Sequence, residues 1–341
     1  MRGVMDARRG LAPASGGAVL EIHDLSLEFP VYKGSVKALN GVSLTVAPGE
    51  IVGVVGESGS GKSVTAMAAL RLLPPDGFKI TGGSLRLLGR DILAASEKEM
   101  RAVRGGDAAM IFQEPMTALN PTRRVGAQLV DVIRCHQSLS REQALVKAVG
   151  LLRDMYIADP EQILRRYPFE LSGGMRQRVM IALAFSCDPA LLIADEPTTA
   201  LDVTVQRQVL LLLREKARER GTAILFITHD MAVVSQFCDR VYVMYAGSVV
   251  EEGATARVMA RPRHPYTLGL LAGLPENASP GAMLPSIRGQ VPNMAAPPAG
   301  CAFRDRCDHA DEACLAHPAL RDLGEPGRKA ACWHVLNGEP A

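Results

Sequence analysis

Three features are missing from this 341-residue sequence, and each absence excludes a class of protein. No apolar run approaches the ~20 residues needed to cross a bilayer, so we expect no membrane-spanning segment. No excess of one charge is present, since 38 Lys and Arg oppose 36 Asp and Glu, and this balance gives no support to a nucleic-acid partner. Residues 1–18 contain arginines but no apolar stretch of a secretory signal, which predicts a disordered extension on a cytoplasmic protein.

The composition indicates a globular protein with a sizeable core, because 48% of the residues are hydrophobic and 22% are charged. Seven cysteines are present, and in the cytoplasm they are not expected to form structural disulfides. Cys135, Cys187 and Cys238 are scattered and are interpreted as ordinary core or helix residues. The other four lie within residues 301–332, and this clustering suggests a local site.

The order of apolar patterns predicts an α/β fold. Alternation over residues 19–46 indicates antiparallel strands joined by a polar stretch at about 33–37, and the run 51–55 indicates a buried strand before a Gly-rich turn and a helix. Residues from about 115 to 185 show helical spacing at 125–133, at 141–155 and after Gly174. Continuous apolar runs at 190–194 and 224–228 flank an amphipathic stretch at 205–218, the pattern of a parallel sheet covered on both faces.

A motif of the form G-x-x-x-x-G-K-[ST] lies between the predicted strand and helix, which is the context that supports a P-loop. Its residues are Gly56, Glu57, Ser58, Gly59, Ser60, Gly61, Lys62 and Ser63. The glycines let backbone N–H groups surround phosphate oxygens, Lys62 reaches the β- and γ-phosphates, and Ser63 is a Mg²⁺ ligand. A flexible Gly/Ser turn is the alternative. The motif predicts a P-loop NTPase (RecA-like) core.

Acidic residues and a histidine follow the next two predicted strands. Asp195 and Glu196 end the strand at 190–194, where Mg²⁺ takes a second protein contact; Asp195 is therefore assigned to the metal and Glu196 to the attacking water. His229 follows the strand at 224–228, so the parallel-sheet rule brings it to the same edge, where it is expected to contact the γ-phosphate. An acidic turn and an ordinary surface or core histidine are the structural alternatives.

These motifs, with three more, resemble the ABC-transporter ATPases. Residues 171–175 resemble the family's signature, Gln113 its Q-loop, Asp202 with the two residues before it its D-loop, and His229 its H-loop. The resemblance covers about residues 19–262. It implies an antiparallel β subdomain, a helical subdomain at about 115–185, and Gln113 as a further Mg²⁺ ligand.

Other details resemble one branch of that family, the ATPase subunits of dipeptide and oligopeptide importers, most of all those of the D type. Val64 replaces the commoner Thr, Met175 replaces the commoner Gln, and the stretch 263–267 precedes a cysteine-bearing tail. Residues 263–341 are accordingly identified as a small C-terminal domain of the oligopeptide-transporter type. From 273 to 300, frequent proline and glycine indicate a loop or linker.

The resemblance implies how the ATPase works and with what. Two ATPase subunits would pair head to tail, with each ATP held between one P-loop and the other subunit's signature. A heterodimer is favoured over a homodimer, on the cytoplasmic face of the inner membrane, with two permease subunits and a periplasmic or lipid-anchored peptide-binding protein. Phe29 is the candidate for stacking on adenine, and a core aromatic is the alternative. The implied signature residues are Leu171, Ser172, Gly173, Gly174 and Met175.

Cys301, Cys307, Cys314 and Cys332 have the spacing C-x5-C-x6-C-x17-C. The C-x2-4-C pair usual in zinc sites is absent, whereas four thiolates also suit a [4Fe–4S] cluster, which the related importer ATPases are thought to hold at matching positions. Zinc and four unliganded thiols stay open as alternatives.

The sequence thus predicts an ATPase that powers peptide import. Import of nickel, glutathione or haem is the alternative within the same class. A soluble ATPase acting on nucleic acid or ribosomes, and an exporter ATPase, are less favoured. The first would usually carry paired ATPase domains or basic arms, and the second would lack the stretch 263–267 and the cysteine tail.

Overall fold

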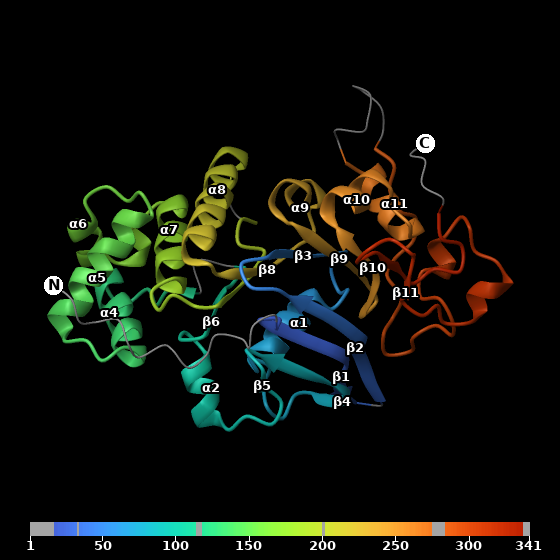
Figure 1. The fold of residues 1–341 in the computed structure, drawn as a ribbon, viewed down its shortest axis with the longest axis horizontal. Coiled ribbons are helices and arrows are strands. Elements are labelled where there is room, and N and C mark those ends of the chain that lie inside the picture. The colour runs from blue at the N-terminus through green and yellow to red at the C-terminus, as the bar shows by residue number, and fades with distance from the viewer. Residues whose placement is uncertain (1–16, 33, 114–117, 200–201, 275–283, 337–341) are drawn as a thin grey trace.

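The computed structural model describes residues 17–32, 34–113, 118–199, 202–274 and 284–336, and within them two sheets organise the chain (Figure 1). The smaller sheet is antiparallel, with strand order β2-β1-β4-β5. Its strands are β1 (Leu20–Val31), β2 (Gly34–Val46), β4 (Lys79–Leu87) and β5 (Arg90–Asp91). The two predicted antiparallel strands are confirmed, but the predicted position of their connection, about 33–37, is wrong. β2 already begins at Gly34, which pairs with Val31.

The larger sheet has eight strands in the order β11-β12-β10-β9-β3-β8-β7-β6. Its parallel part comprises β6 (Ala108–Ile111), β7 (Leu191–Asp195), β8 (Ala223–Thr228), β3 (Ile51–Val55) and β9 (Arg240–Tyr245). β10 (Ser248–Ala254), β12 (Lys329–Ala330) and β11 (Arg321–Asp322) continue it in antiparallel fashion. Every residue of β3, β7 and β8 is buried, which explains their uninterrupted apolar sequences.

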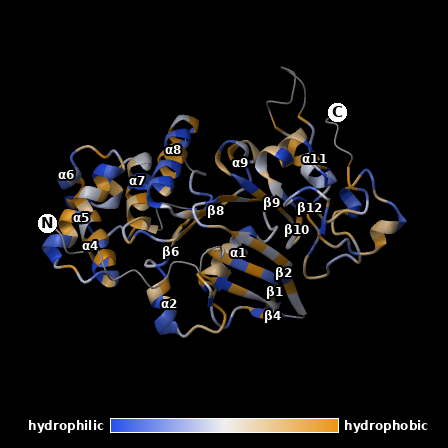
Figure 2. Ribbon diagram, in the orientation of Figure 1, coloured by the Kyte–Doolittle hydropathy of each residue, from blue (hydrophilic) through white to orange (hydrophobic). Residues whose placement is uncertain are grey.

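Helices flank the larger sheet and also form a separate group. That group follows β6 and contains α4 (Val125–His136), α5 (Arg141–Asp154), α6 (Pro160–Arg165) and α7 (Gly173–Ala184), so the helical stretches predicted within 115–185 are confirmed. The remaining α-helices are α1 (Lys62–Ala69), α2 (Glu97–Val103), α8 (Val203–Arg220), α9 (Met231–Phe237), α10 (Thr255–Ala260) and α11 (Pro265–Ala272). Figure 2 shows hydrophobic residues along the central strands and many hydrophilic ones on α8.

The C-terminal region, residues 263–336, lies at the β10 side of the larger sheet and is not a detached tail (Figure 1). It contains α11, two short 3-10 helices, Arg304–Arg306 and Glu312–Leu315, and the β11–β12 pair that extends the sheet. The predicted disordered extension falls almost wholly outside the described residues, as do residues 275–283 of the predicted linker.

Among the described residues, no helix combines the length and apolar character that crossing a membrane requires. The predicted fold class is confirmed. The domain boundaries at residues 18/19 and 262/263 stay predictions.

Candidate nucleotide-binding and catalytic site

The P-loop joins the end of β3 to the start of α1, as the sequence predicts. Two positions of the loop require glycine, because the neighbouring backbone leaves no room for a Cβ atom. A Cβ on Gly56 would lie 2.2 Å from the carbonyl oxygen of Met244, and one on Gly61 would lie 2.8 Å from that of Ala38. Gly61 also has φ +98°, a conformation that L-residues rarely adopt.

Lys62 is buried at the first position of α1, and its ammonium group contacts the loop that precedes it. Its Nζ donates hydrogen bonds to the carbonyl oxygens of Gly56 at 2.7 Å and Glu57 at 2.9 Å. Burial lowers the pKa of Lys62, and the nearby carboxylates of Glu196 and Asp195 partly oppose this effect. The ammonium group of Lys62 therefore lies against the P-loop, where the phosphate groups of a nucleotide would bind.

Ser63 and Asp195 come together although 132 positions separate them. The Ser63 hydroxyl donates to Oδ1 of Asp195 at 3.1 Å, and Asp195 is buried at the end of β7. Burial raises the pKa of Asp195, while the hydrogen bond from Ser63 lowers it. A hydroxyl and a carboxylate at the edge of a P-loop are oxygen ligands of the type Mg²⁺ takes, so these two residues fit the predicted metal position.

Glu196 lies at the centre of the polar cluster. Its Oε1 is 3.0 Å from Nδ1 of His229, and its Oε2 accepts from Nε2 of Gln113 at 3.0 Å and from the Thr199 hydroxyl at 2.9 Å. Burial alone would raise the pKa of Glu196, but the hydrogen bonds from His229 and Thr199 outweigh it and lower the pKa. An ionised carboxylate held by three side chains can orient a water and accept its proton.

The structure therefore brings together Gln113, Glu196 and His229, which follow three different strands of the parallel sheet. The expected Mg²⁺ contact of Gln113 stays a prediction, because the contact that the structure records for its side chain is with Glu196. Sequence analysis missed Thr199. The available signal was a hydroxyl residue three positions after Glu196, in the turn that leaves β7.

The remaining predicted nucleotide contacts lie on different elements. Ser58 and Gly59 are exposed on the loop, Ser60 is buried, and Val64 is half-buried in α1. Phe29 is half-buried on β1 and packs against the apolar core beneath the smaller sheet. Its adenine contact stays a prediction.

The signature residues surround the N-terminus of α7, within the helical group (Figure 1). Leu171 is buried, Gly173 is exposed, and Gly174 and Met175 are half-buried. The exposed Ser172 is the N-cap and accepts from the N–H of Met175 at 3.4 Å. Asp202 caps α8 by accepting from the N–H of Val205 at 2.9 Å, while the other two D-loop residues, 200 and 201, lie outside the described residues. A helix N-terminus presents free N–H groups that suit an anion, and the predicted role of the signature in binding phosphate stays a prediction.

The four cysteines of the C-terminal region are free thiols and lie near one another. The pKa of Cys332 is raised to about 11, mainly by burial and in smaller part by the other three thiols. The N–H groups of Phe303 and His309 are directed at the sulfurs of Cys301 and Cys307, respectively. Such donors stabilise thiolates that bind iron or zinc.

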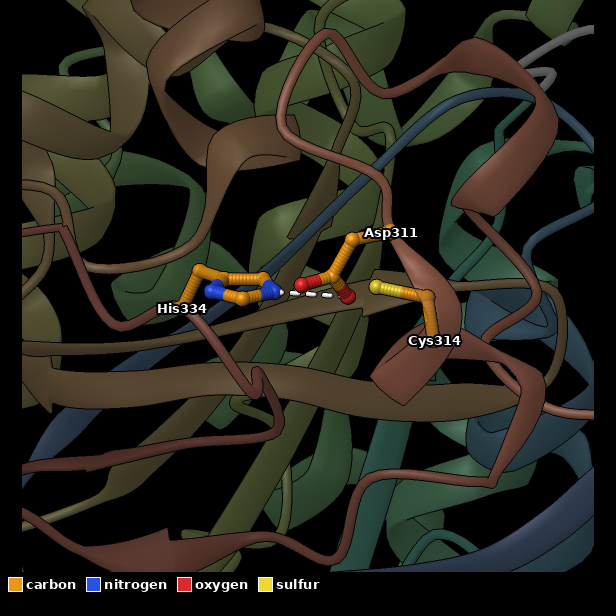
Figure 3. Close-up of side chains that lie close together, drawn as sticks. All are labelled: Asp311, Cys314 and His334. Atoms are coloured by element: carbon orange, nitrogen blue, oxygen red, sulfur yellow. Dashed lines mark ion pairs between the residues drawn. The ribbon is translucent and has the colours of Figure 1, made fainter.

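Figure 3 shows that Cys314 has two further neighbours, Asp311 and His334. Nε2 of His334 lies 2.9 Å from Oδ1 of Asp311, and the ligand atoms of all three residues lie within 4.8 Å of one another. Among the described residues, these three therefore form a group that lies close enough together to hold a metal ion.

Solved structures share the fold of most of this chain. A structure described as a dimeric bacterial ABC transporter cassette, MJ0796, superposes with a TM-score of 0.62 at 25% identity, covering 69% of this chain and 98% of the other. Another, cbiO1 from Clostridium perfringens, superposes with a TM-score of 0.62 at 27% identity, covering 71% and 91%. Residues 39–199 match the family described as ABC transporter. The chain is an ABC-type ATPase.

Within that class, residues 250–314 match the family described as oligopeptide/dipeptide transporter, C-terminal region. The chain is 62% identical to the probable D,D-dipeptide transport ATP-binding protein DdpD of Escherichia coli over 93% of its length and 96% of the relative's. It is 47% identical to the oligopeptide transport ATP-binding protein OppD of Salmonella typhimurium, over 94% and 95%. It belongs to the ATP-binding subunits of the dipeptide and oligopeptide ABC transporter family.

Proposed function

We propose that this chain powers the import of dipeptides or oligopeptides by hydrolysing ATP on the cytoplasmic face of the inner membrane. The observation that carries the proposal is a complete polar cluster around Glu196 in a chain whose C-terminal region is of the oligopeptide/dipeptide type. The substrate class is supported by the names of the relatives, which include D,D-dipeptide and oligopeptide transport proteins.

The motor step follows from two anion-binding elements that one chain places on different parts of its fold. ATP binds the P-loop of one subunit and the N-terminus of α7 in the other, so nucleotide joins two facing subunits. Glu196 accepts a proton from the attacking water, with His229 orienting the carboxylate and contacting the γ-phosphate. Mg²⁺, held through Ser63, Asp195 and Gln113, would supply charge neutralisation to the phosphates. Loss of the γ-phosphate then removes the contacts of Ser172 to Gly174 and opens the dimer.

A groove beside the helical group supports contact with a permease. It lies between the segment that follows α1 and the elements β6, α4 and α7, holds a volume of about 240 Å³, and is lined mainly by apolar side chains. Phe112, which is 43% exposed, and Leu72, which is 36% exposed, stand at this groove. Because Gln113 directly follows Phe112 and bonds to Glu196, a segment seated in the groove would be linked to the hydrolytic centre.

The assembly that we propose contains a second, different ATPase subunit, two permease subunits and a periplasmic or lipid-anchored peptide-binding protein. We further propose that the C-terminal cysteines bind a [4Fe–4S] cluster. Two observations support this proposal: the four thiols lie near one another, and backbone N–H groups are directed at the sulfurs of Cys301 and Cys307.

Transport by the assembled complex tests the main proposal. The chain, coexpressed with its permease subunits and binding protein in membrane vesicles, should accumulate a labelled dipeptide when ATP is supplied. The Lys62→Ala variant should abolish uptake, whereas the matched variant Lys98→Ala, at an exposed lysine of α2, should leave it unchanged. Uptake of nickel, glutathione or haem in place of peptides would overturn the substrate class. Undiminished uptake by Lys62→Ala would overturn the motor role.

Metal analysis tests the cluster. The anaerobically purified chain should contain iron and inorganic sulfide and absorb visible light. Cys307→Ser should lose the iron, the sulfide and the absorption. Cys135→Ser, at an exposed thiol of α4, is the control and should keep them. Stoichiometric zinc in the wild-type chain would show that the cluster assignment is wrong and would favour the group of Asp311, Cys314 and His334. Absence of both metals would favour unliganded thiols.

A further inference from the structure

The second residue of the P-loop, Glu57, is held by two residues of the C-terminal region. Tyr266 lies 209 positions further along the chain and Arg306 lies 249 positions further. We propose that Tyr266 and Arg306 are positioning residues of the nucleotide site, which hold the P-loop through Glu57 in its phosphate-binding conformation. The C-terminal region would thereby set the affinity of this subunit for ATP. The inference rests on the ATPase activity of the family and is independent of the transported solute.

Tyr266 fixes one peptide plane of the loop. Its hydroxyl accepts from the N–H of Glu57 at 2.8 Å, and the carbonyl of the same peptide group, that of Gly56, accepts from Nζ of Lys62 at 2.7 Å. The peptide group that Lys62 contacts is therefore held at its other end by Tyr266. Turning this peptide would move the lysine and the N–H groups that follow it.

Arg306 fixes the side chain of Glu57 in a two-pronged ion pair. Its Nη1 donates to Oε2 at 2.6 Å and its Nη2 to Oε1 at 3.0 Å. Paired hydrogen bonds between guanidinium and carboxylate define an orientation as well as a distance. Since the Glu57 carbonyl also accepts from Lys62, the N–H, the C=O and the carboxylate of this residue all have partners.

The C-terminal side of this contact is buried and well packed. Arg306 is 7% exposed, and its Nε donates to the carbonyl of Arg288 at 2.8 Å. Tyr245, Tyr266 and Phe303 form a buried aromatic group with ring centroids 4.7 to 5.4 Å apart, and the guanidinium lies over two of these rings. An arginine packed in this way differs from a mobile surface ion pair, which contributes little.

A purely structural role of the same residues predicts a different result. Stapling the C-terminal region to the core would affect unfolding and leave the affinity of the folded chain for nucleotide unchanged. A positioning role affects that affinity, and it does so through Glu57. The two roles are separated by measuring the Kd for a fluorescent ATP analogue alongside KM and kcat for ATP in the assembled complex.

Tyr266→Phe removes one oxygen atom and should raise the Kd and KM about fivefold, the effect of one lost hydrogen bond, with little change in kcat. Arg306→Gln should raise the Kd and KM about tenfold. Arg306→Lys keeps the charge without the paired geometry, so its Kd and KM should lie between those of Arg306→Gln and wild type. Arg304→Gln is the matched control, because this arginine lies in the same 3-10 helix and pairs with Asp305. It should leave the Kd unchanged.

The double variant Glu57→Gln/Arg306→Gln provides the decisive comparison. If Arg306 acts through Glu57, the Kd of the double variant should equal that of Glu57→Gln alone. Losses that multiply in the double variant would overturn the proposal, as would wild-type affinity in both Tyr266→Phe and Arg306→Gln. Should Arg306→Gln fail to fold, Tyr266→Phe still decides the question, since it keeps the ring packing. A wild-type chain that binds ATP but imports no peptide would refute the peptide assignment and leave this test intact.

Discussion

Glu196 has an unusual backbone conformation. Its φ is +45°, in the left-handed region that non-glycine residues seldom occupy. The N–H of Glu196 donates to the carbonyl of Ile227 on the neighbouring strand at 2.9 Å, which helps to keep the residue in place. Strain of this kind costs of order 1–3 kcal/mol and persists only where surrounding contacts fix it. Here those contacts aim the carboxylate at His229 and Gln113.

Replacing the carboxylate by an amide tests its role at the scale of one residue. Glu196→Gln should lower the rate of ATP hydrolysis at least ~100-fold, because the amide cannot accept a proton from water. ATP binding should stay within about threefold of wild type, since the P-loop is untouched, and closed dimers should accumulate with ATP. Phosphate release, nucleotide binding and gel filtration measure the three effects. Glu142→Gln, at an exposed glutamate of α5, is the control. Undiminished hydrolysis would remove Glu196 from its role.

At the scale of the element, α11 is a short helix whose N-cap is a buried histidine. Nδ1 of His264 accepts from the N–H of Tyr266 at 3.0 Å, so the cap also orients the residue that contacts the P-loop. The side chain is 2% exposed, and burial lowers its pKa to about 4. In the folded chain His264 is therefore neutral at pH 7.

This lowered pKa predicts sensitivity to acid. The unfolded chain binds a proton near pH 6.5 and the folded one only near pH 4, so stability is fully present above pH 6.5 and falls as the pH drops toward 4. The contribution lost between pH 8 and pH 5 is about 2 kcal/mol. His264→Asn, which retains an acceptor for the cap but does not titrate, should reduce the pH-dependent loss by about that amount. Urea unfolding at several pH values measures it, and an unchanged pH slope in the variant would contradict the assignment.

At the scale of the whole molecule, the C-terminal region is joined to the core sheet by a fully buried ion pair. Nη2 of Arg328 donates to Oε1 of Glu251 at 2.6 Å, and the side chains are 1% and 0% exposed. Glu251 also accepts from the backbone N–H groups of Arg263 and His264. Burial raises the pKa of Glu251, and Arg328 is among the groups that oppose this rise.

Removing one partner of this pair should therefore cost far more than removing both. Arg328→Met should destabilise the chain by about 3–5 kcal/mol, because it leaves a buried carboxylate without its cation. Adding Glu251→Gln should restore part of that loss. The midpoint of urea-induced unfolding measures both, with Lys98→Met, an exposed change on α2, as the control. A loss below about 1 kcal/mol in Arg328→Met would show that the pair is not what joins the two parts.

The site features that could be predicted from the sequence lie in short contiguous segments of the chain. The P-loop and the Asp195-Glu196 pair could be identified from the sequence, because strand, turn and helix follow one another and the chemistry depends on that local order. The meeting of Glu196 and His229 was also predictable, since parallel strands end at the same edge of a sheet.

The contacts of Glu57 with Tyr266 and Arg306 were not predictable in this way. They join residues more than 200 positions apart, and β11 and β12, each two residues long, show no periodicity by which their place at the sheet edge could be recognised. By itself, the sequence determined the nucleotide chemistry, because that chemistry resides in short motifs with a local geometry. Only the tertiary structure decided that the C-terminal region contacts the P-loop, because the packing of buried side chains depends on the whole fold.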